Sequence, residues 1–114
     1  MKPLIKHTRS FPVSIYMAGS YSKALKLIQE YCDQVGYCVT IHSNLYVYRG
    51  GKEAGIRVGL INYPRFPSDP VTIVAKATEI AEKLRVGLKQ ESYSIETPHD
   101  TIWYSYRKED VSED

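Results

Sequence analysis

The sequence predicts an α+β domain whose two helices cover one face of a mainly antiparallel sheet. Two observations support this fold class. In segments 20–35 and 71–88, apolar residues recur at spacings of three and four, which is typical of an amphipathic helix. Around these segments, apolar and polar residues alternate, which is typical of half-buried strands. The resulting order is βαββ-βαββ. The repeated pattern reflects either an internal duplication or a coincidental similarity of the two halves.

The first half is expected to begin with a strand and a helix. Residues 12–18 alternate and form the first strand. The helical stripe starts after Ser20, and Gly36 is the expected stop because glycine readily adopts the left-handed conformation that ends many helices.

A hairpin is expected to complete the first half. Residues 37–42 and 45–49 both alternate, and Ser43-Asn44 between them predicts a short turn. The glycine-rich segment 50–55 is then expected to be a loop. It lacks the residue order of a phosphate-binding P-loop and precedes a strand rather than a helix, so we do not expect it to bind phosphate.

The second half repeats this pattern. Residues 56–61 form the expected fourth strand. Asp69 is the expected cap of the second helix, with Pro70 in its first position, where the missing N–H costs nothing. The last two strands are expected at 92–97 and 101–107, which are rich in Tyr, Ile and Trp.

The chain contains ten tyrosines, and many lie on the expected strands. We expect the sheet face away from the helices to carry an aromatic patch with neighbouring cations, formed by Tyr46, Tyr48, Arg49, Trp103, Tyr104, Tyr106 and Arg107. Three uses of this patch remain open: cross-strand packing, an interface with another subunit, and stacking of bases or nucleotides.

Three of the six prolines fall in the segment "NYPRFPSDP", residues 62–70. Proline fixes φ and restricts the residue before it, so this connection between a strand and a helix should be stiff. The helix N-terminus and Arg65 could receive an anion here, between flat walls formed by Tyr63 and Phe66, and Ser68 and Asp69 complete the predicted ligand-binding set. The alternative is a rigid connection in which Arg65 is solvated.

No set of residues predicts catalysis. The three histidines are scattered without metal-ligand spacing, and no nucleophile elbow is present, so we predict no catalytic residue, metal or cofactor. His99 and Asp100 are adjacent, but such pairs are common in turns. They are the basis for a small hydrolase or transferase as an alternative function.

Length and composition predict a single domain spanning residues 1–114, with a basic tail at 1–10 and an acidic tail at 108–114. No apolar run is long enough to cross a bilayer, and the N-terminus lacks the apolar core of a secretory signal, so a cytoplasmic location is expected. Cys32 and Cys38 are expected to be buried reduced thiols. The net charge of +2 is too small to predict a polyanionic partner.

The segments "FPVSIYMAG", "EYCDQVGYCVTI", "GIRVGLINYPRFPSDP" and "DTIWYS" together resemble small uncharacterised proteins encoded by bacteriophages and prophages. The resemblance covers about residues 11–106 and carries no motif of known chemistry. It implies a host cytoplasm during infection, where small phage proteins bind host components or signalling nucleotides.

These observations predict a non-catalytic accessory protein of phage type, with no membrane association and with a homo-oligomeric assembly. It is expected to recognise a host protein or a small anionic ligand such as a nucleotide. The alternative from a different class is a module that binds single-stranded nucleic acid on the aromatic sheet face.

Overall fold

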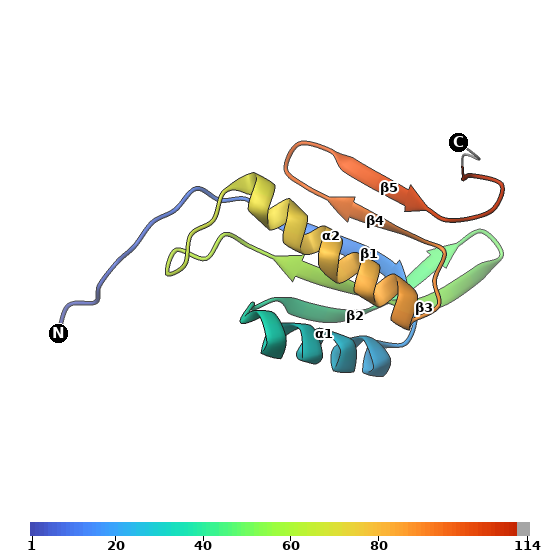
Figure 1. Ribbon diagram of the computed structural model, residues 1–114, viewed down its shortest axis with the longest axis horizontal. Helices are drawn as coiled ribbons and strands as arrows, with labels where there is room; N and C mark the ends of the chain where they lie inside the picture. Colours follow the sequence, from blue (N-terminus) through green and yellow to red (C-terminus); the bar gives the residue numbers. More distant parts are fainter. Residues whose placement is uncertain (112–114) are drawn as a thin grey trace.

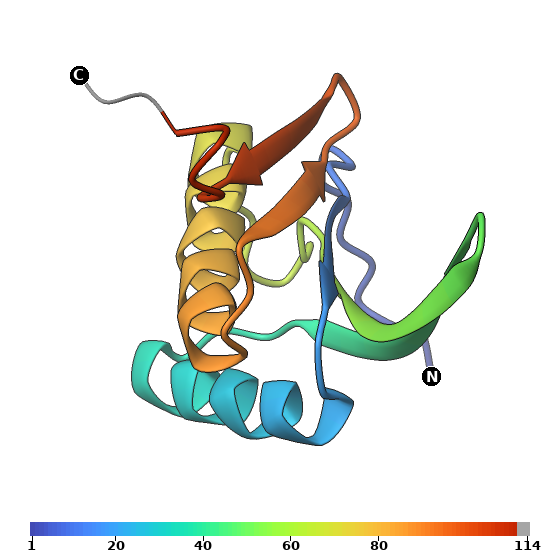
Figure 2. The same ribbon diagram turned by 90° about the vertical axis from the view of Figure 1, so that its right-hand side faces the viewer.

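The computed structural model describes residues 1–111 and contains two helices and a five-stranded sheet. In chain order the elements are β1 (Val13–Ala18), α1 (Tyr21–Val35), β2 (Thr40–Tyr48), β3 (Gly51–Leu60), α2 (Pro70–Gly87), β4 (Ser92–Glu96) and β5 (Thr101–Ser105). The strands are all antiparallel to their neighbours, in the order β2-β3-β1-β4-β5. Both helices cover the same face (Figures 1 and 2), which confirms the predicted α+β class.

The predicted strand count was wrong: five strands are present where six were expected. The hairpin about residues 43–44 does not form, because β2 runs through them and pairs with β3 over its whole length. The turn lies instead at Gly50, which has a φ of 81°. The segment 51–55, expected to be a loop, is the first half of β3. The βαββ-βαββ order is therefore replaced by βαββαββ, and the two halves of the chain do not repeat.

The physical reason is visible in the alternation itself. Ile41, Leu45 and Val47 occupy odd-numbered positions, and Ser43 lies between them at the same spacing of two. The alternation therefore fits one continuous strand. A Ser-Asn pair is compatible with an extended strand, so nothing in the segment requires a turn. Pairing with a ten-residue β3 then satisfies the backbone hydrogen bonds of both strands.

The core lies between the helices and the sheet. Its fully buried side chains include Ile15, Ile56, Leu60, Ile73 and Ile95. Central strand β1 alternates buried and half-buried residues, so one face joins the core and the other belongs to the open face of the sheet. The open face and the ends of the strands are therefore the parts of the sheet that the helices leave uncovered.

The predicted helix ends are confirmed. Ser20 accepts a hydrogen bond from the Lys23 amide, and Gly36 ends α1 with a φ of 72°. Asp69 caps α2 by accepting from the Thr72 amide at 2.7 Å, with Pro70 beginning the helix. These capping bonds satisfy amides that have no partner within the helix.

A polar cluster joins α2 to the last strands. The buried Tyr93 hydroxyl donates to Glu82 at 2.6 Å, and Arg85 forms an ion pair with the same carboxylate at 3.1 Å. Burial and the bond to Glu82 raise the pKa of Tyr93. The Arg85 guanidinium also lies 3.7 Å from the centre of the Tyr106 ring, so the segment after β5 is held against the helix.

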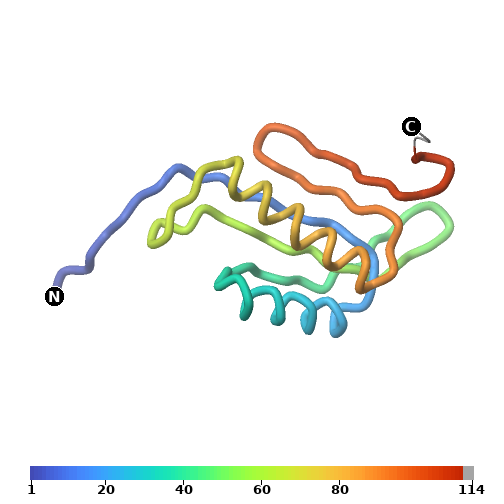
Figure 3. The backbone as a smooth tube through the Cα atoms, in the orientation of Figure 1, coloured from blue at the N-terminus to red at the C-terminus, as the bar shows by residue number. Residues whose placement is uncertain are grey.

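The N-terminal arm, residues 1–12, has no helix or strand. Its beginning extends away from the body of the protein (Figure 3), whereas Phe11 near its end is buried in the core. The arm is anchored where the buried Asn62 side chain donates to the Arg9 carbonyl at 2.9 Å. Of the predicted acidic tail, residues 108–110 form a turn, and 112–114 lie outside the described residues. Within residues 1–111, neither helix is both long and apolar enough to cross a membrane.

Candidate functional site

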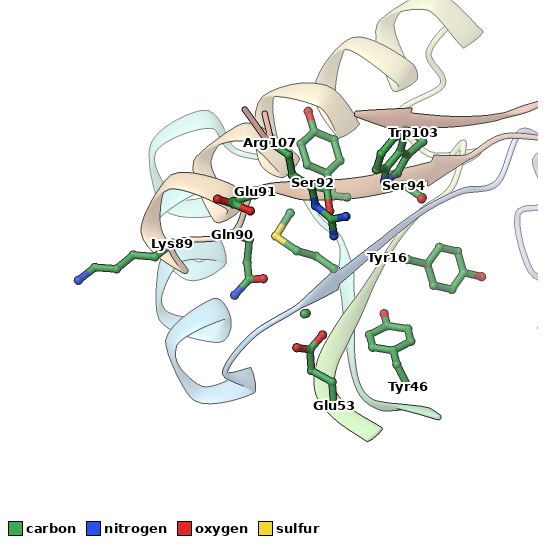
Figure 4. A pocket seen from close by; sticks show the side chains of 13 residues that line it. Tyr16, Tyr46, Glu53, Lys89, Gln90, Glu91, Ser92, Ser94, Trp103 and Arg107 are labelled. Carbon is green, nitrogen blue, oxygen red and sulfur yellow. The ribbon is translucent and has the colours of Figure 1, made fainter. Parts of the chain in front are cut away.

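A hollow of about 480 Å³ opens on the open face of the sheet, at the end where α2 connects to β4 (Figure 4). Its lining comes from β1, the β2–β3 hairpin, the segment before β4 and the region of β5 and its continuation. Glu53, Gln90 and Arg107 extend toward its middle, whereas Lys89 extends away from it. Cavities of this size accommodate small organic ligands.

Tyr46 forms one wall of this hollow and depends on a glycine across the strand pair. The Tyr46 ring lies over Gly55, where an added Cβ would overlap both the ring and the Met17 carbonyl oxygen. The Tyr46 hydroxyl donates to the Ile56 carbonyl oxygen, which fixes the ring in place. Burial raises the pKa of Tyr46 above the ordinary value for a tyrosine, which keeps the hydroxyl available as a donor.

Tyr16, Tyr93 and Trp103 are the other aromatic residues of the lining. The Tyr16 hydroxyl donates to Glu96 at 3.2 Å, which restricts the ring. Trp103 is 55% exposed, so a broad apolar surface remains available to a ligand. Flat rings that are already held in position lose little conformational entropy when a planar ligand stacks on them.

The hollow carries charges of both signs. Glu53 and Glu91 line it together with Arg107, and no ion pair of any of these three is found within residues 1–111. Arg107 lies 6.0 Å from the centre of the Trp103 ring. Unpaired carboxylates beside an unpaired guanidinium suit a ligand that itself carries both positive and negative groups.

The backbone on both sides of Arg107 is held by hydrogen bonds. The Tyr106 amide donates to the Glu91 carbonyl at 2.7 Å, which ties the end of the chain to the segment before β4. The Arg107 amide donates to the Ser105 hydroxyl oxygen at 3.2 Å. The backbone that carries Glu91 is therefore tied to the backbone next to Arg107.

The predicted aromatic patch is divided between the two faces of the sheet. Tyr46, Trp103 and Arg107 line the hollow. Tyr104 lies on the helix side, where its ring stacks on Tyr93 at 4.9 Å, and Tyr106 lies under Arg85. Residues 48–49 lie at the tip of the β2–β3 hairpin, outside the hollow. The grouping was wrong because strand alternation separates positions 103 and 104.

The predicted ligand-binding loop has a pocket of its own. Tyr63, Arg65, Phe66 and Ser68 line a second cavity of about 370 Å³. Asp69 is not part of this lining. Its carboxylate occupies the N-terminus of α2, so the expected anion site at the helix dipole is already filled by a negative group.

The residues proposed for hydrolysis form a turn. Asp100 accepts a hydrogen bond from the Thr97 hydroxyl at 3.0 Å, and the Thr97 hydroxyl oxygen also accepts from the His99 amide. The His99 ring lies beside Phe11, with the ring centres 5.8 Å apart. Within residues 1–111, no group of three or more potential ligands could hold a metal ion.

Sequence reasoning missed Tyr16, Glu53 and Glu91 as site residues. Tyr16 was detectable, because the alternation of β1 puts it on the face opposite Ile15. Glu53 was hidden by the expectation that residues 50–55 form a loop. Glu91 lies in the irregular segment between α2 and β4. Nothing in the neighbouring sequence indicates that it lies beside residues from other strands.

Comparison with solved structures identifies the fold. A phage SAM lyase in its apo state matches with a TM-score of 0.67 and 15% sequence identity, over 90% of this chain and 96% of that chain. A phage SAM lyase in complex with S-methyl-5'-thioadenosine matches with a TM-score of 0.63 and 14% identity over the same shares. No family model and no curated protein matches the chain. At this identity, the likeness establishes a shared fold.

Proposed function

We propose that this chain is a phage-type protein that binds a small nucleoside of the SAM class in the hollow on its open sheet face. The observation that carries the proposal is the convergence of aromatic walls and unpaired charges of both signs in one cavity. The fold likeness to a phage SAM lyase, and to one in complex with S-methyl-5'-thioadenosine, supports it.

The chemistry of such a ligand matches the lining. An adenine ring is flat and stacks on aromatic side chains, which contributes about 1 to 3 kcal/mol per base. Trp103 offers the exposed ring for this contact. SAM also carries a sulfonium and an ammonium group, which suit Glu53 and Glu91, and a carboxylate, which suits Arg107.

Two probes separate these roles. S-methyl-5'-thioadenosine has the nucleoside but lacks the charged groups, whereas SAM has both. Isothermal titration should detect saturable binding of both probes to the wild-type protein. Trp103→Ala should weaken both by about 5- to 150-fold, corresponding to the loss of one stacking contact. Glu53→Gln should weaken SAM and leave S-methyl-5'-thioadenosine nearly unchanged.

Tyr48→Ala is the matched control for Trp103→Ala, because Tyr48 is an aromatic residue of similar exposure that lies on the β2–β3 hairpin, outside the hollow. Its affinities should equal those of the wild-type protein. Absence of binding for both probes, or equal losses in Tyr48→Ala and Trp103→Ala, would contradict the proposal.

Cleavage of SAM is a second candidate function. The unpaired Glu53 and Glu91 carboxylates favour it, because one of them could accept a proton from the carbon next to the C–S bond. The C–H electrons then form a double bond in the amino acid part, and S-methyl-5'-thioadenosine leaves with the electrons of the broken C–S bond. Release of S-methyl-5'-thioadenosine from SAM over time, followed by mass spectrometry, tests it. Formation of this product at equal rates with wild-type protein and with the Glu53→Gln, Glu91→Gln double variant would rule out this role.

Homo-oligomeric assembly and a host partner remain predictions, which native mass spectrometry and affinity capture would test.

A further inference from the structure

A second cavity lies at the opposite end of the sheet from the hollow. This crossover pocket, of about 370 Å³, is formed by residues 36–38 after α1 and by the connection between β3 and α2, residues 61–68. It shares no lining residue with the hollow. A ligand bound here would therefore leave the first site free.

The walls of the crossover pocket are mostly aromatic. Tyr37 and Tyr63 are half-buried, and Phe66 is 73% exposed at the rim. The Cys38 thiol lies 3.5 Å from the Tyr63 hydroxyl oxygen and fixes one wall. The rings leave a broad exposed apolar surface, which a flat apolar ligand would cover.

The connection that carries these walls is held rigidly. The buried Asn62 side chain accepts a hydrogen bond from the Ser68 amide at 2.9 Å and donates to the N-terminal arm. The Phe66 amide donates to the Tyr63 carbonyl at 2.9 Å, which closes a turn around Pro64. A pocket held in this way requires little ordering when a ligand binds.

The rim of the pocket is positively charged. Arg65 lies 5.3 Å from the centre of the Phe66 ring. Together with Lys6 and Pro64, it also lines a neighbouring depression. Neither cation forms an ion pair within residues 1–111. The nearby Asp69 is bound to the Thr72 amide and does not line the pocket.

We propose that the crossover pocket binds a small planar aromatic anion, with its ring between Tyr37, Tyr63 and Phe66 and its negative group on Arg65. The three rings supply the apolar contact, and the planar guanidinium binds a carboxylate through two parallel hydrogen bonds. This site is independent of the nucleoside site and would remain if that proposal failed.

The exposed Cys38 provides a direct measure of occupancy. Naphthalene-2-carboxylate serves as the probe, and naphthalene-2-carboxamide is its neutral counterpart. Alkylation of Cys38 by iodoacetamide, followed by peptide mass mapping, should slow at least fivefold at saturating carboxylate. Cys32, which does not line the pocket, should react at an unchanged rate. The carboxamide should protect at least ten times more weakly.

Arg65→Ala should weaken protection by the carboxylate at least tenfold, whereas Arg65→Lys should retain part of it. Arg49→Ala is the control, because it removes an arginine remote from the pocket and should change nothing. Circular dichroism confirms that each variant is folded before it is compared. Absence of protection, equal protection by the neutral probe, or full protection in Arg65→Ala would each overturn the proposal.

Discussion

The bond between Tyr93 and Glu82 should contribute measurably to stability, and Tyr93→Phe removes it while keeping the ring. The hydroxyl donates to a carboxylate at 2.6 Å, and Tyr93 itself is only 3% exposed, but the Glu82 side chain is 33% exposed, so water can replace part of the lost bond. Hydrogen bonds to charged groups contribute about 1.5 to 3 kcal/mol. Glu82 keeps its ion pair with Arg85 at 3.1 Å, so the carboxylate is not left without a partner. We therefore expect a loss near the lower limit, about 1.5 to 2 kcal/mol.

Urea denaturation measures this loss as a lower midpoint with an unchanged m-value, and the melting temperature should fall by roughly 6 to 8 °C. Tyr104→Phe is the matched control, because its ring stacks on Tyr93 but no hydrogen bond of its hydroxyl is found within residues 1–111. Equal stability of the two variants would show that the Glu82 bond contributes nothing net.

The stabilities of wild type and Tyr93→Phe should also depend differently on pH in the alkaline range. The folded protein raises the pKa of Tyr93 through burial and the bond to Glu82, so this phenol stays protonated where an unfolded tyrosine ionises, near pH 10. The stabilisation that the Tyr93 hydroxyl gives to the folded protein is complete below about pH 10 and decreases as the pH rises above it. The stability difference between wild type and Tyr93→Phe should consequently shrink by about 1.4 kcal/mol at pH 11. A difference independent of pH would refute the reasoning.

Three further changes test separate parts of the structure. Gly55→Ala places a methyl group against the Tyr46 ring and should cost about 1 to 3 kcal/mol in urea denaturation, together with weaker nucleoside binding. Cys38→Ala should lower the pKa of Tyr63 from about 12 toward its ordinary value, because the bond to Cys38 is the largest cause of the shift; ultraviolet titration measures it, and an unchanged value contradicts this cause. Asn62→Ala removes the hydrogen bond between the Asn62 side chain and the Arg9 carbonyl, and should speed tryptic cleavage within the first ten residues. Unchanged cleavage would show that this bond does not hold the N-terminal arm.

The helices were predictable because their signals are local. Gly36 and Asp69 were identified from the chain alone as the end of one helix and the cap of the other, and both adopt that geometry. Ser20, where the helical stripe was expected to start, caps α1. The β2–β3 hairpin was not predicted correctly, because Gly51 and Gly55 suggested a loop. Gly55 is needed instead for the close approach of Tyr46 from the neighbouring strand, which is a contact that local sequence does not reveal.

The candidate sites were predictable to different degrees. Most of the crossover pocket comes from one short segment, residues 61–68, so Tyr63, Arg65 and Phe66 were identified together. Tyr37 comes from the link after α1 and was not part of the prediction. Cys38 in this pocket was expected to be buried, but it is exposed because it lies on the link before β2 rather than within the core. The hollow brings together residues from both halves of the chain, and Glu53 and Arg107 meet there only through the strand order.

The strand order also explains why the open face, rather than the helix face, is available for a ligand. Core residues on β1, β3 and β4 are covered by α1 and α2, so the helix side has no room around the central strands. The hairpin of β2 and β3 curves away from the helices at its tip (Figure 2) and carries Tyr46 and Glu53 toward the segment that holds Arg107. The likeness at 15% identity concerns the fold, and a shared fold does not by itself carry over a function. The function of this chain therefore has to be tested on its own Glu53, Trp103 and Arg107.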